Sequence, residues 1–379
     1  TIQHQFSNTL TAQIGYVGQH GTHLLNFEDV AQSIALNAQG TIAKPGQTIA
    51  SVVPGPFLGG GTPGSLYLAD NSNFGGKQAL AGANMSNASQ RYDALQAVLQ
   101  KRMGNGLQGQ VAYTWSKCLS NSPGYYGTGW GSTNAQSSGG QPGPQNIYDL
   151  RSDWGPCYFD QTHIVSSYVT YALPVGRQKQ FGHDLNPVLN ALVGNWEIGS
   201  IISFHTGNAL TLNQFGGWAA GNPDPSNTNG IGPFTLSERP NCNGPINVVD
   251  RFVPSDPTTP ANAGTPGYIQ WFDISNVSTP TTRSFGTCSV GNIRGPHYSN
   301  VDMSLHKEFP FSESKRLEFR FEALNAFNHP VLTFSGGPST GSFDAGTPVI
   351  GPSSSNPSFG RITGSQGARQ LQLALKFIF

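Results

Sequence analysis

The amino-acid sequence predicts an all-β protein, namely a segment of an antiparallel transmembrane β-barrel with about eight membrane strands, long external loops and short periplasmic turns. Three observations support this fold class. Apolar and polar side chains alternate strictly in several segments of about ten residues, the length of a tilted strand that crosses a bilayer. Long and short connections between these segments also alternate. Finally, the composition is poor in charge and rich in glycine and proline.

Composition narrows the class of protein. Only 11% of the 379 residues are charged, against about 25% in typical soluble domains. The 48 glycines and 27 prolines indicate many turns and long loops. Lys+Arg and Asp+Glu are both 20, so the chain lacks the basic patch of a nucleic-acid-binding protein. No run of apolar residues is long enough for a transmembrane helix, which excludes a helical membrane protein.

The strongest alternation lies in residues 300–379, where successive side chains of each predicted strand point to opposite faces. The apolar positions are Val301, Met303, Leu305 and Phe309, then Leu317, Phe319, Phe321 and Ala323, then Leu371, Leu373, Leu375, Phe377 and Phe379. The second segment carries Arg316, Glu318, Arg320 and Glu322 on its polar face. This row suits a water-filled or plugged lumen, and the bulky apolar face suits lipid. An antiparallel sheet with one wet face alternates in the same way, so periodicity alone leaves both open.

The predicted strands occupy residues 9–18, 91–101, 106–117, 161–173, 192–204, 300–309, 315–327 and 369–379. Residues 23–27 are candidates to prolong the first strand beyond the membrane. Residues 102–105 form a tight turn, and Asn186 followed by Pro187 is a cap for a short helix over 186–193.

The connections favour a membrane barrel over a soluble sheet. Long connections at 19–90, 118–160, 205–299 and 328–368 alternate with short ones at 102–105, 174–191 and 310–314. Outer-membrane barrels have this asymmetry, with short turns on the periplasmic side and long loops outside. Soluble domains rarely contain such long connections without structure of their own. We therefore expect the last strand to end at the periplasm, with Phe377 and Phe379 as a C-terminal signal for the barrel-assembly machinery.

All four cysteines fall at the predicted external side. Cys118 and Cys157 bracket one long connection, and Cys242 and Cys288 lie in the next. Four cysteines allow three pairings, and an oxidising exterior favours the local pairs Cys118–Cys157 and Cys242–Cys288. A zinc site is the alternative, but no CxxC or HxxxH spacing supports it.

The sequence signals for catalytic groups are weak. Asp160 and His163 lie near Cys157, but polar residues at a strand entrance explain them better. The glycine run Gly59-Gly60-Gly61 lacks the strand and helix that flank a phosphate-binding loop. Glu318 and Glu322 are interleaved with arginines, which resembles a ladder of ion pairs more than an acid–base pair. We expect no enzymatic activity, no cofactor and no metal.

Several motifs resemble Oar-like TonB-dependent receptors. Residues 317–330 read LEFRFEALNAFNHP and resemble the signature FRxExFNxFNHP of that family. Further matches are FGRIT at 359–363, ARQLQLALK at 368–376, YTWSK at 113–117, Phe159-Asp160 with His163, LPVGR at 173–177, and GYVG at 15–18 with GTHL at 21–24. The resemblance covers nearly the whole chain.

This resemblance implies a bacterial outer-membrane location and a 22-stranded barrel. Residues 1–379 would be its C-terminal part, and the N-terminal domain and the plug that contacts the TonB complex would be absent. The chain starts at Thr1 without a signal segment, so we expect a fragment. Expected partners are outer-membrane lipid and an unknown substrate, an oligosaccharide or a peptide by the resemblance.

Three functions compete. The first is a segment of a TonB-dependent transporter that takes part in substrate capture and uptake. The second is a self-contained small barrel that acts as an adhesin or a structural anchor, although a small closed barrel needs a lumen filled by side chains. The third is a secreted carbohydrate-binding sandwich, which the loops rich in Asn, Gly and Tyr favour.

Overall fold

A computed structural model describes residues 1–29, 34–53, 82–121, 144–157, 159–177, 179–214, 239–255, 267–278, 284–312, 315–334, 349–350 and 360–379. The glycine run 59–61 and Phe359 lie outside these ranges. Within the described ranges, no helix has the length and apolarity that spanning a membrane requires.

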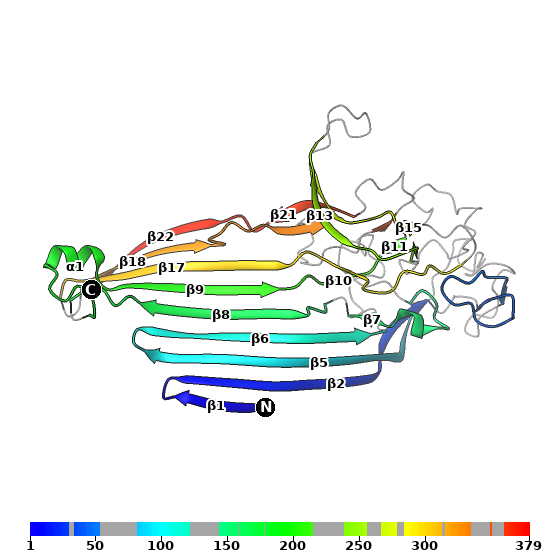
Figure 1. The fold of residues 1–379 in the computed structure, drawn as a ribbon, viewed down its shortest axis with the longest axis horizontal. Helices are drawn as coiled ribbons and strands as arrows, with labels where there is room; N and C mark the ends of the chain where they lie inside the picture. Colours follow the sequence, from blue (N-terminus) through cyan, green and yellow to red (C-terminus); the bar gives the residue numbers. More distant parts are fainter. Residues whose placement is uncertain are drawn as a thin grey trace.

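A ten-stranded sheet dominates the described structure (Figure 1). Its order is β1 (Ile2–Ser7), β2 (Leu10–Asp29), β5 (Gly82–Gly104), β6 (Leu107–Ser120), β8 (His163–Ala172), β9 (Trp196–His205), β17 (Tyr298–Pro310), β18 (Arg316–Leu324) and β22 (Gln370–Ile378), with β7 (Gly155–Pro156) beside β6. Every neighbouring pair is antiparallel. Among the described residues the sheet is open, with β1 at one edge and β22 at the other.

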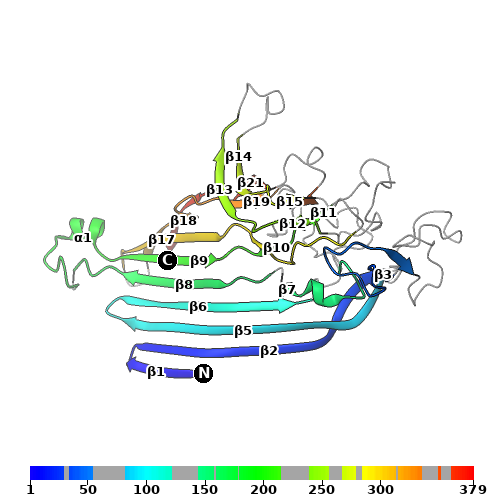
Figure 2. The same cartoon turned by 45° about the vertical axis from the view of Figure 1, so that its right-hand side comes forward.

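The two ends of the sheet differ, as the connection lengths predict. At one end, here named the turn end, lie the short links and the helix α1 (Pro187–Val193) (Figures 1 and 2). At the other end, the loop end, the described parts of the four long connections gather. All eight predicted strands are present, and the antiparallel β fold that the sequence predicts is confirmed.

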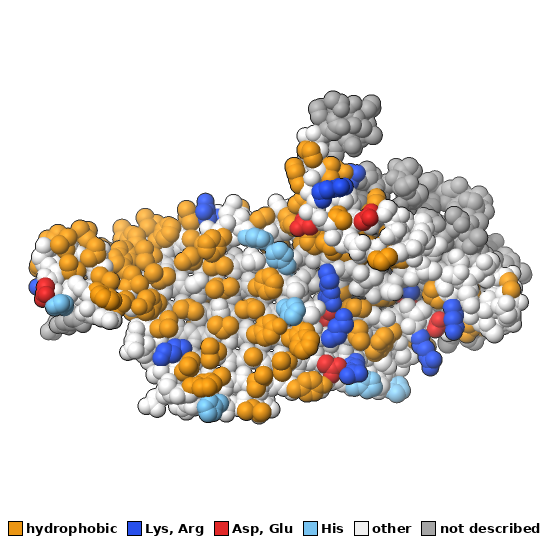
Figure 3. Space-filling model, in the orientation of Figure 1, with side chains coloured by type: hydrophobic (Ala, Val, Ile, Leu, Met, Phe, Trp, Pro, Cys, Tyr) orange, Lys and Arg blue, Asp and Glu red, His pale blue; other side chains and the backbone are white. Residues whose placement is uncertain are grey.

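Strand register divides the side chains between an apolar face and a polar face, as the alternation predicts. On the apolar face, paired residues of neighbouring strands form rows across the sheet. Three such rows are Leu95, Trp115 and His163, then Leu99, Val111 and Ser167, then Leu305, Phe321 and Leu373. The polar face carries Gln96 beside Thr114, and Glu308 beside Glu318. Figure 3 shows hydrophobic side chains spread over the sheet and more charged ones toward the loop end than elsewhere on this face.

Four expectations about element bounds are wrong. A further strand of the main sheet, β1, precedes the first predicted one. Ile2 and His4 face its apolar side, and the polar His4 interrupts the apolar pattern. Residues 19–90 are not all connection, because β2 and β5 stay paired as far as Asp29 and Gly82. This extension includes residues 23–27, as expected.

The first hairpin turn and the start of β9 are also shifted. The turn lies at Asn105 and Gly106, not at 102–105. Both residues have positive φ, 53° and 78°, which the mirror-image turns of two-residue hairpins require. β9 begins at Trp196, not at residue 192, because residues 187–193 form α1. Asn186 caps this helix and accepts a 2.8 Å hydrogen bond from the Leu189 amide.

The long connections contain structure of their own, which the sequence did not predict. Small sheets pair β3 (Ile34–Leu36) with β4 (Ser51–Val53), β10 (Ala209–Leu210) with β16 (Ile293–Arg294), β11 (Asn213–Gln214) with β20 (Val349–Ile350), and β12 (Asn241–Cys242) with β15 (Val277–Ser278). A four-stranded sheet runs β13 (Val248–Val253), β14 (Tyr268–Phe272), β21 (Arg361–Gln366) and β19 (Val331–Phe334). We name the described part of these connections the loop cap.

A hydrophobic core holds the loop cap together. Its buried residues are Leu210, Leu212, Trp271, Phe272, Cys288, Ile293 and Ile362. A second cluster joins Ala35, Ala43 and Ile49 to Phe285. Each cluster combines residues from different long connections, so the cap folds as a unit rather than as separate loops.

Candidate functional site: a polar wall and a braced cap

Charged residues on the polar face of β17 and β18 form a ladder, here named the polar wall (His306, Glu308, Arg316, Glu318, Arg320 and Glu322). The register places Glu308 opposite Glu318 and His306 opposite Arg320. On the other side of β18, Lys376 of β22 lies opposite Glu318. Strand alternation alone therefore brings these side chains to one face.

Ion pairs link the members of the polar wall. Arg320 lies 2.6 Å from a Glu318 oxygen and 3.9 Å from a Glu322 oxygen. Arg316 lies 3.6 Å from Glu308. The two arginines are half exposed, so these pairs are solvated and add little stability. The arrangement makes a solvated surface in which two arginines pair with three glutamates.

One group in the polar wall has the donors for a metal ion. Among the described residues, His306, Glu308 and Glu318 offer three ligand atoms within 4.8 Å of one another. However, Arg320 already pairs with Glu318, and Arg316 with Glu308. Because both carboxylates are neutralised by guanidinium groups, the cluster serves as part of the ion-pair ladder.

Two disulfides fasten the loop cap. Cys118 of β6 is bonded to Cys157, and Cys242 of β12 to Cys288; these are the local pairs that the sequence favours. The first bond ties its connection directly to a strand of the main sheet. Constraining segments of 39 and 46 residues reduces the freedom of the unfolded chain, which stabilises the folded cap.

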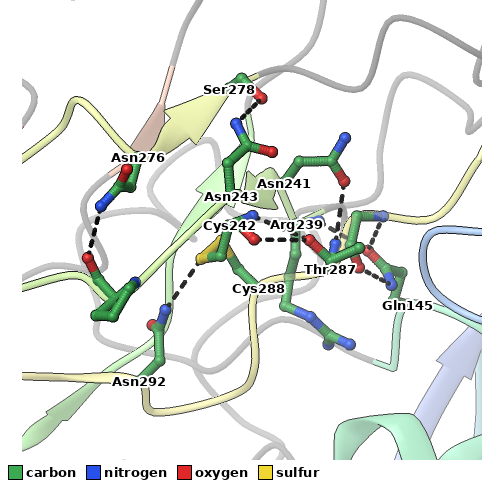
Figure 4. Close-up of a disulfide and its surroundings, with 12 residues drawn as sticks. Gln145, Arg239, Asn241, Cys242, Asn243, Asn276, Ser278, Thr287, Cys288 and Asn292 are labelled. Atoms are coloured by element: carbon green, nitrogen blue, oxygen red, sulfur yellow. Dashed lines mark hydrogen bonds between the residues drawn. A yellow bond between two sulfur atoms is a disulfide. The ribbon is translucent and has the colours of Figure 1, made fainter.

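Gln145 bridges two different connections beside the second disulfide (Figure 4). Its side-chain oxygen accepts hydrogen bonds from the amides of Arg239, at 3.0 Å, and Gly286, at 3.2 Å. Its side-chain nitrogen donates to the Gly286 carbonyl at 3.2 Å. A Cβ at Gly286 would lie 1.7 Å from the Arg239 carbonyl oxygen, so only glycine permits this approach.

Two ion pairs brace the same region. Arg239 pairs with Asp153, and its guanidinium also donates to the Ser152 carbonyl at 3.1 Å. Arg294 pairs with Asp160, whose carboxylate also accepts from the Cys118 amide at 2.6 Å. Each pair joins the connection between β6 and β8 to the one between β9 and β17. The buried charges of Arg239 and Asp153 are thus paired with each other, as burial demands.

The side chains of Cys157, Asp160 and His163 each have a different partner in the structure. Cys157 is in a disulfide and Asp160 binds Arg294. His163 instead lies 2.8 Å from the hydroxyl of Tyr113 through its Nδ1. The three side chains therefore have structural contacts at the strand entrance, which is the interpretation that the sequence favours.

The asparagines of the 317–330 motif shape the turn after β18. Asn325 and Asn328 have positive φ, 48° and 55°, a conformation that asparagine tolerates well. The Asn325 amide donates to Asp302 at 2.8 Å, and its side-chain oxygen accepts from the His329 amide at 2.9 Å. Asn328 accepts from the Arg369 amide at 3.1 Å. The motif therefore fixes the chain between β18 and β19 and aligns β22.

A buried carboxyl lies where β2 and β5 leave the main sheet. Glu28 accepts hydrogen bonds from the side-chain amides of Asn26 and Asn87, both at 2.8 Å. Burial raises the pKa of Glu28, and the nearby Asp153 adds to this, while the two amides oppose it. Burial and the charge of Glu28 also raise the pKa of the Tyr148 hydroxyl. This region of β2 lies beyond the apolar band, next to the cap.

The sequence did not predict the residues that brace the cap. Gln145, Asp153, Arg239 and Arg294 lie in irregular connections, where no period marks them. One signal was available: in a chain with so few charges, an isolated Asp or Arg inside a long connection indicates a paired, structural charge.

Comparison with known proteins identifies the family. A model of the outer membrane beta barrel domain matches residues 1–372. No curated protein matches the chain. Among solved structures, the outer membrane transporter YddB from Escherichia coli matches with a TM-score of 0.39 and 7% identity, over 100% of this chain and 31% of that one. The chain thus spans less than a third of that transporter. With one apolar face, one wet face and long connections at one end, this chain belongs to the outer membrane beta barrel domain family and resides in the bacterial outer membrane.

Proposed function

We propose that the chain forms part of the wall and the external cap of a TonB-dependent outer-membrane transporter, and that it takes part in substrate capture and uptake. The polar face lines the lumen, and the polar wall residues Arg316, Glu318, Arg320 and Glu322 keep that surface wet. The loop cap lies at the outside and presents the surface that a substrate meets first. Energy arrives from the TonB complex through a plug outside this chain.

The bracing of the loop cap carries this proposal. Gln145 and two ion pairs lock separate connections into one body, and two disulfides fasten it. A rigid external body of this kind is what selective capture requires, since a preformed surface loses less entropy on binding. A plain structural anchor has no need of such bracing.

The open sheet favours a wall segment over a self-contained small barrel. Among the described residues, β1 and β22 do not pair with each other. Unpaired backbone groups are costly in lipid, so we infer that further strands complete the barrel. Phe377 and Phe379 would then serve as the recognition signal for the barrel-assembly machinery.

Adhesion is the second candidate. The β13–β14 hairpin projects from the body (Figure 2), and Val248, Val249 and Phe252 are exposed on it. Exposed apolar residues on a projecting element favour contact with another surface.

Uptake by intact cells tests the proposal. The probes are a fluorescein-labelled tetrapeptide and a fluorescein-labelled maltotetraose, compared in cells with and without the gene. We expect accumulation of one probe to fall to background in the deletion strain and also after a protonophore, since TonB-driven transport needs the proton gradient. A different result would support adhesion instead. In that case the deletion strain accumulates both probes as well as the parent strain does, but it no longer attaches to surfaces.

A further inference from the structure

Helix α1 lies against the apolar face at the turn end, and one lysine holds it there. Lys307 belongs to the apolar face, because β17 places it between Leu305 and Phe309 and opposite Phe319. The side chain is nevertheless only 2% exposed. Its ammonium donates hydrogen bonds to the carbonyls of Gly194 and, at 3.4 Å, Asn190. These oxygens lie in the last turn of α1 and just after it.

The contacts between this lysine and the helix satisfy both partners. The last carbonyls of a helix lack partners within the helix and carry partial negative charge, so a cation is favoured there. The Trp196 indole donates to the Leu192 carbonyl at 2.9 Å, in the same turn. The ammonium also lies 5.0 Å from the centre of the Trp196 ring and 5.1 Å from that of Phe309, within the range of cation–π attraction. Without α1, Lys307 would present a charge on the apolar face.

The outer side of α1 is apolar and exposed. Four of its residues are exposed in large part, namely Val188 at 69%, Leu189 at 45%, Leu192 at 64% and Val193 at 47%. They form two pairs four residues apart, so they share one side of the helix. Asn190 faces the neighbouring link and accepts from the Arg177 amide at 2.7 Å. In water such a helix would leave a large apolar surface uncovered.

The apolar surface of α1 is continuous with that of the sheet. Figure 3 shows hydrophobic side chains running from α1 onto the turn end of the sheet. Phe311 and Phe377 are exposed at this end, with their ring centres 6.3 Å apart. Exposed cations, Arg177 and Lys179, lie in the link that leads to α1. Apolar residues on one side with cations nearby are typical of a helix that lies in the interface of a bilayer.

We propose that α1 is an interfacial anchor that lies at the boundary between head groups and acyl chains of the phospholipid leaflet at the turn end, and that Lys307 is the positioning residue that holds it. The occupant of the exposed face is phospholipid, since the same face of the sheet is the lipid-contacting one. The anchor sets the depth of the sheet in the membrane. It does not depend on which substrate, if any, the protein transports.

Fluorescence quenching in vesicles of phosphatidylethanolamine and phosphatidylglycerol tests the anchor. The intact protein carries Leu192→Cys, labelled with an environment-sensitive fluorophore; the native cysteines are protected in disulfides. The control is Asp184→Cys in the same link, whose native side chain is 86% exposed. We expect the label at 192 to be quenched several-fold more by a lipid nitroxide near the head group than by aqueous iodide, and the label at 184 to show the reverse. Equal access of iodide to both labels would overturn the anchor, as would stronger quenching at 192 by a nitroxide near the chain end.

A second variant separates the role of Lys307 from the location of α1. In the Leu192→Cys background, Lys307→Met removes the cation while keeping a long side chain, and we expect iodide quenching at 192 to rise several-fold. Lys307→Arg should restore protection, and Lys376→Met on the polar face should change nothing. Folding is checked by the heat-dependent gel mobility of barrels. A folded Lys307→Met protein with unchanged quenching would refute the positioning role, whatever the label at 192 shows.

Discussion

Asp153 and Arg239 form an ion pair inside the loop cap although 86 residues separate them in sequence. Their side chains are 7% and 3% exposed. Asp153 lies at the end of a short 3-10 helix (Leu150–Asp153), and Arg239 precedes β12. One salt bridge therefore joins two long connections that approach the cap from different strands.

Breaking this pair on one side should destabilise the cap. Arg239→Met leaves Asp153 buried and unpaired, and the loss of one partner of a buried pair costs about 3–5 kcal/mol. Hydrogen exchange of cap amides should accelerate accordingly, while amides of the main sheet stay protected. Arg251→Met, at an exposed position of β13, is the matched control and should have little effect. The double variant Asp153→Leu with Arg239→Met should recover much of the loss, and a double variant as unstable as the single one would contradict this account.

Removal of the second disulfide should loosen one connection without unfolding the sheet. Replacing Cys242 and Cys288 together by serine frees a segment of 46 residues, which costs about 3–4 kcal/mol on the chain-entropy model. Limited proteolysis should then cut within residues 206–297 much faster. The matched pair, Cys118 and Cys157 replaced by serine, should expose residues 121–162 instead. Identical cleavage patterns for the two variants would show that the disulfides do not act locally.

Acid should stabilise the junction around Glu28. Burial raises the pKa of Glu28 above that of an unfolded-chain carboxyl, so the folded state binds the proton more tightly. Its contribution to stability is complete below the unfolded pKa and is lost as the pH rises through the folded pKa. Glu28→Gln should abolish this dependence and raise the melting temperature of the cap at neutral pH. The measurement is thermal unfolding across the acidic to neutral range; a variant that keeps the full wild-type pH dependence would rule out Glu28 as its source.

Adjacent residues of β6 should respond oppositely to a charge. Val111 lies on the apolar face and Ala112 on the polar face, both within the same strand. An arginine facing lipid near the bilayer midplane costs about 2–4 kcal/mol, so Val111→Arg should destabilise the protein in vesicles by that amount. Ala112→Arg faces the wet side and should cost much less. Urea unfolding in phosphatidylcholine vesicles compares the two, and equal losses would contradict the assignment of faces.

The main sheet could be predicted from the sequence because side chains alternate between its two faces with a period of two. A period of two assigns each residue to a face, so Leu305, Phe321 and Leu373 were placed on the same face correctly without knowledge of their neighbours. Strand ends depend on partners instead. β2 continues to Asp29 only because β5 stays paired with it there, and no local pattern encodes that.

The cap and the α1 contact could not be predicted for a different reason. Gln145 and Arg239 act through contacts across nearly a hundred residues, with no repeated spacing to reveal them. Lys307 binds a backbone carbonyl 113 residues earlier in the chain, and no local pattern indicates that partner. The motif at 317–330 resembles a family signature, but its physical role in a turn depends on the positive φ angles of Asn325 and Asn328, which no sequence pattern gives.

The long pairing of β2 with β5 has a mechanical consequence. These two strands stay paired from Lys101 at the turn end to Gly82 at the cap, with register shifts only around Thr22–Leu25. A force that pulls the cap away from the membrane acts along the strand axes, so it shears the ladder instead of peeling it open. In shear, many backbone hydrogen bonds share the load and must fail together, because ladder bonds lie across the strands. The cap is therefore tethered most strongly against a force directed along the strand axes.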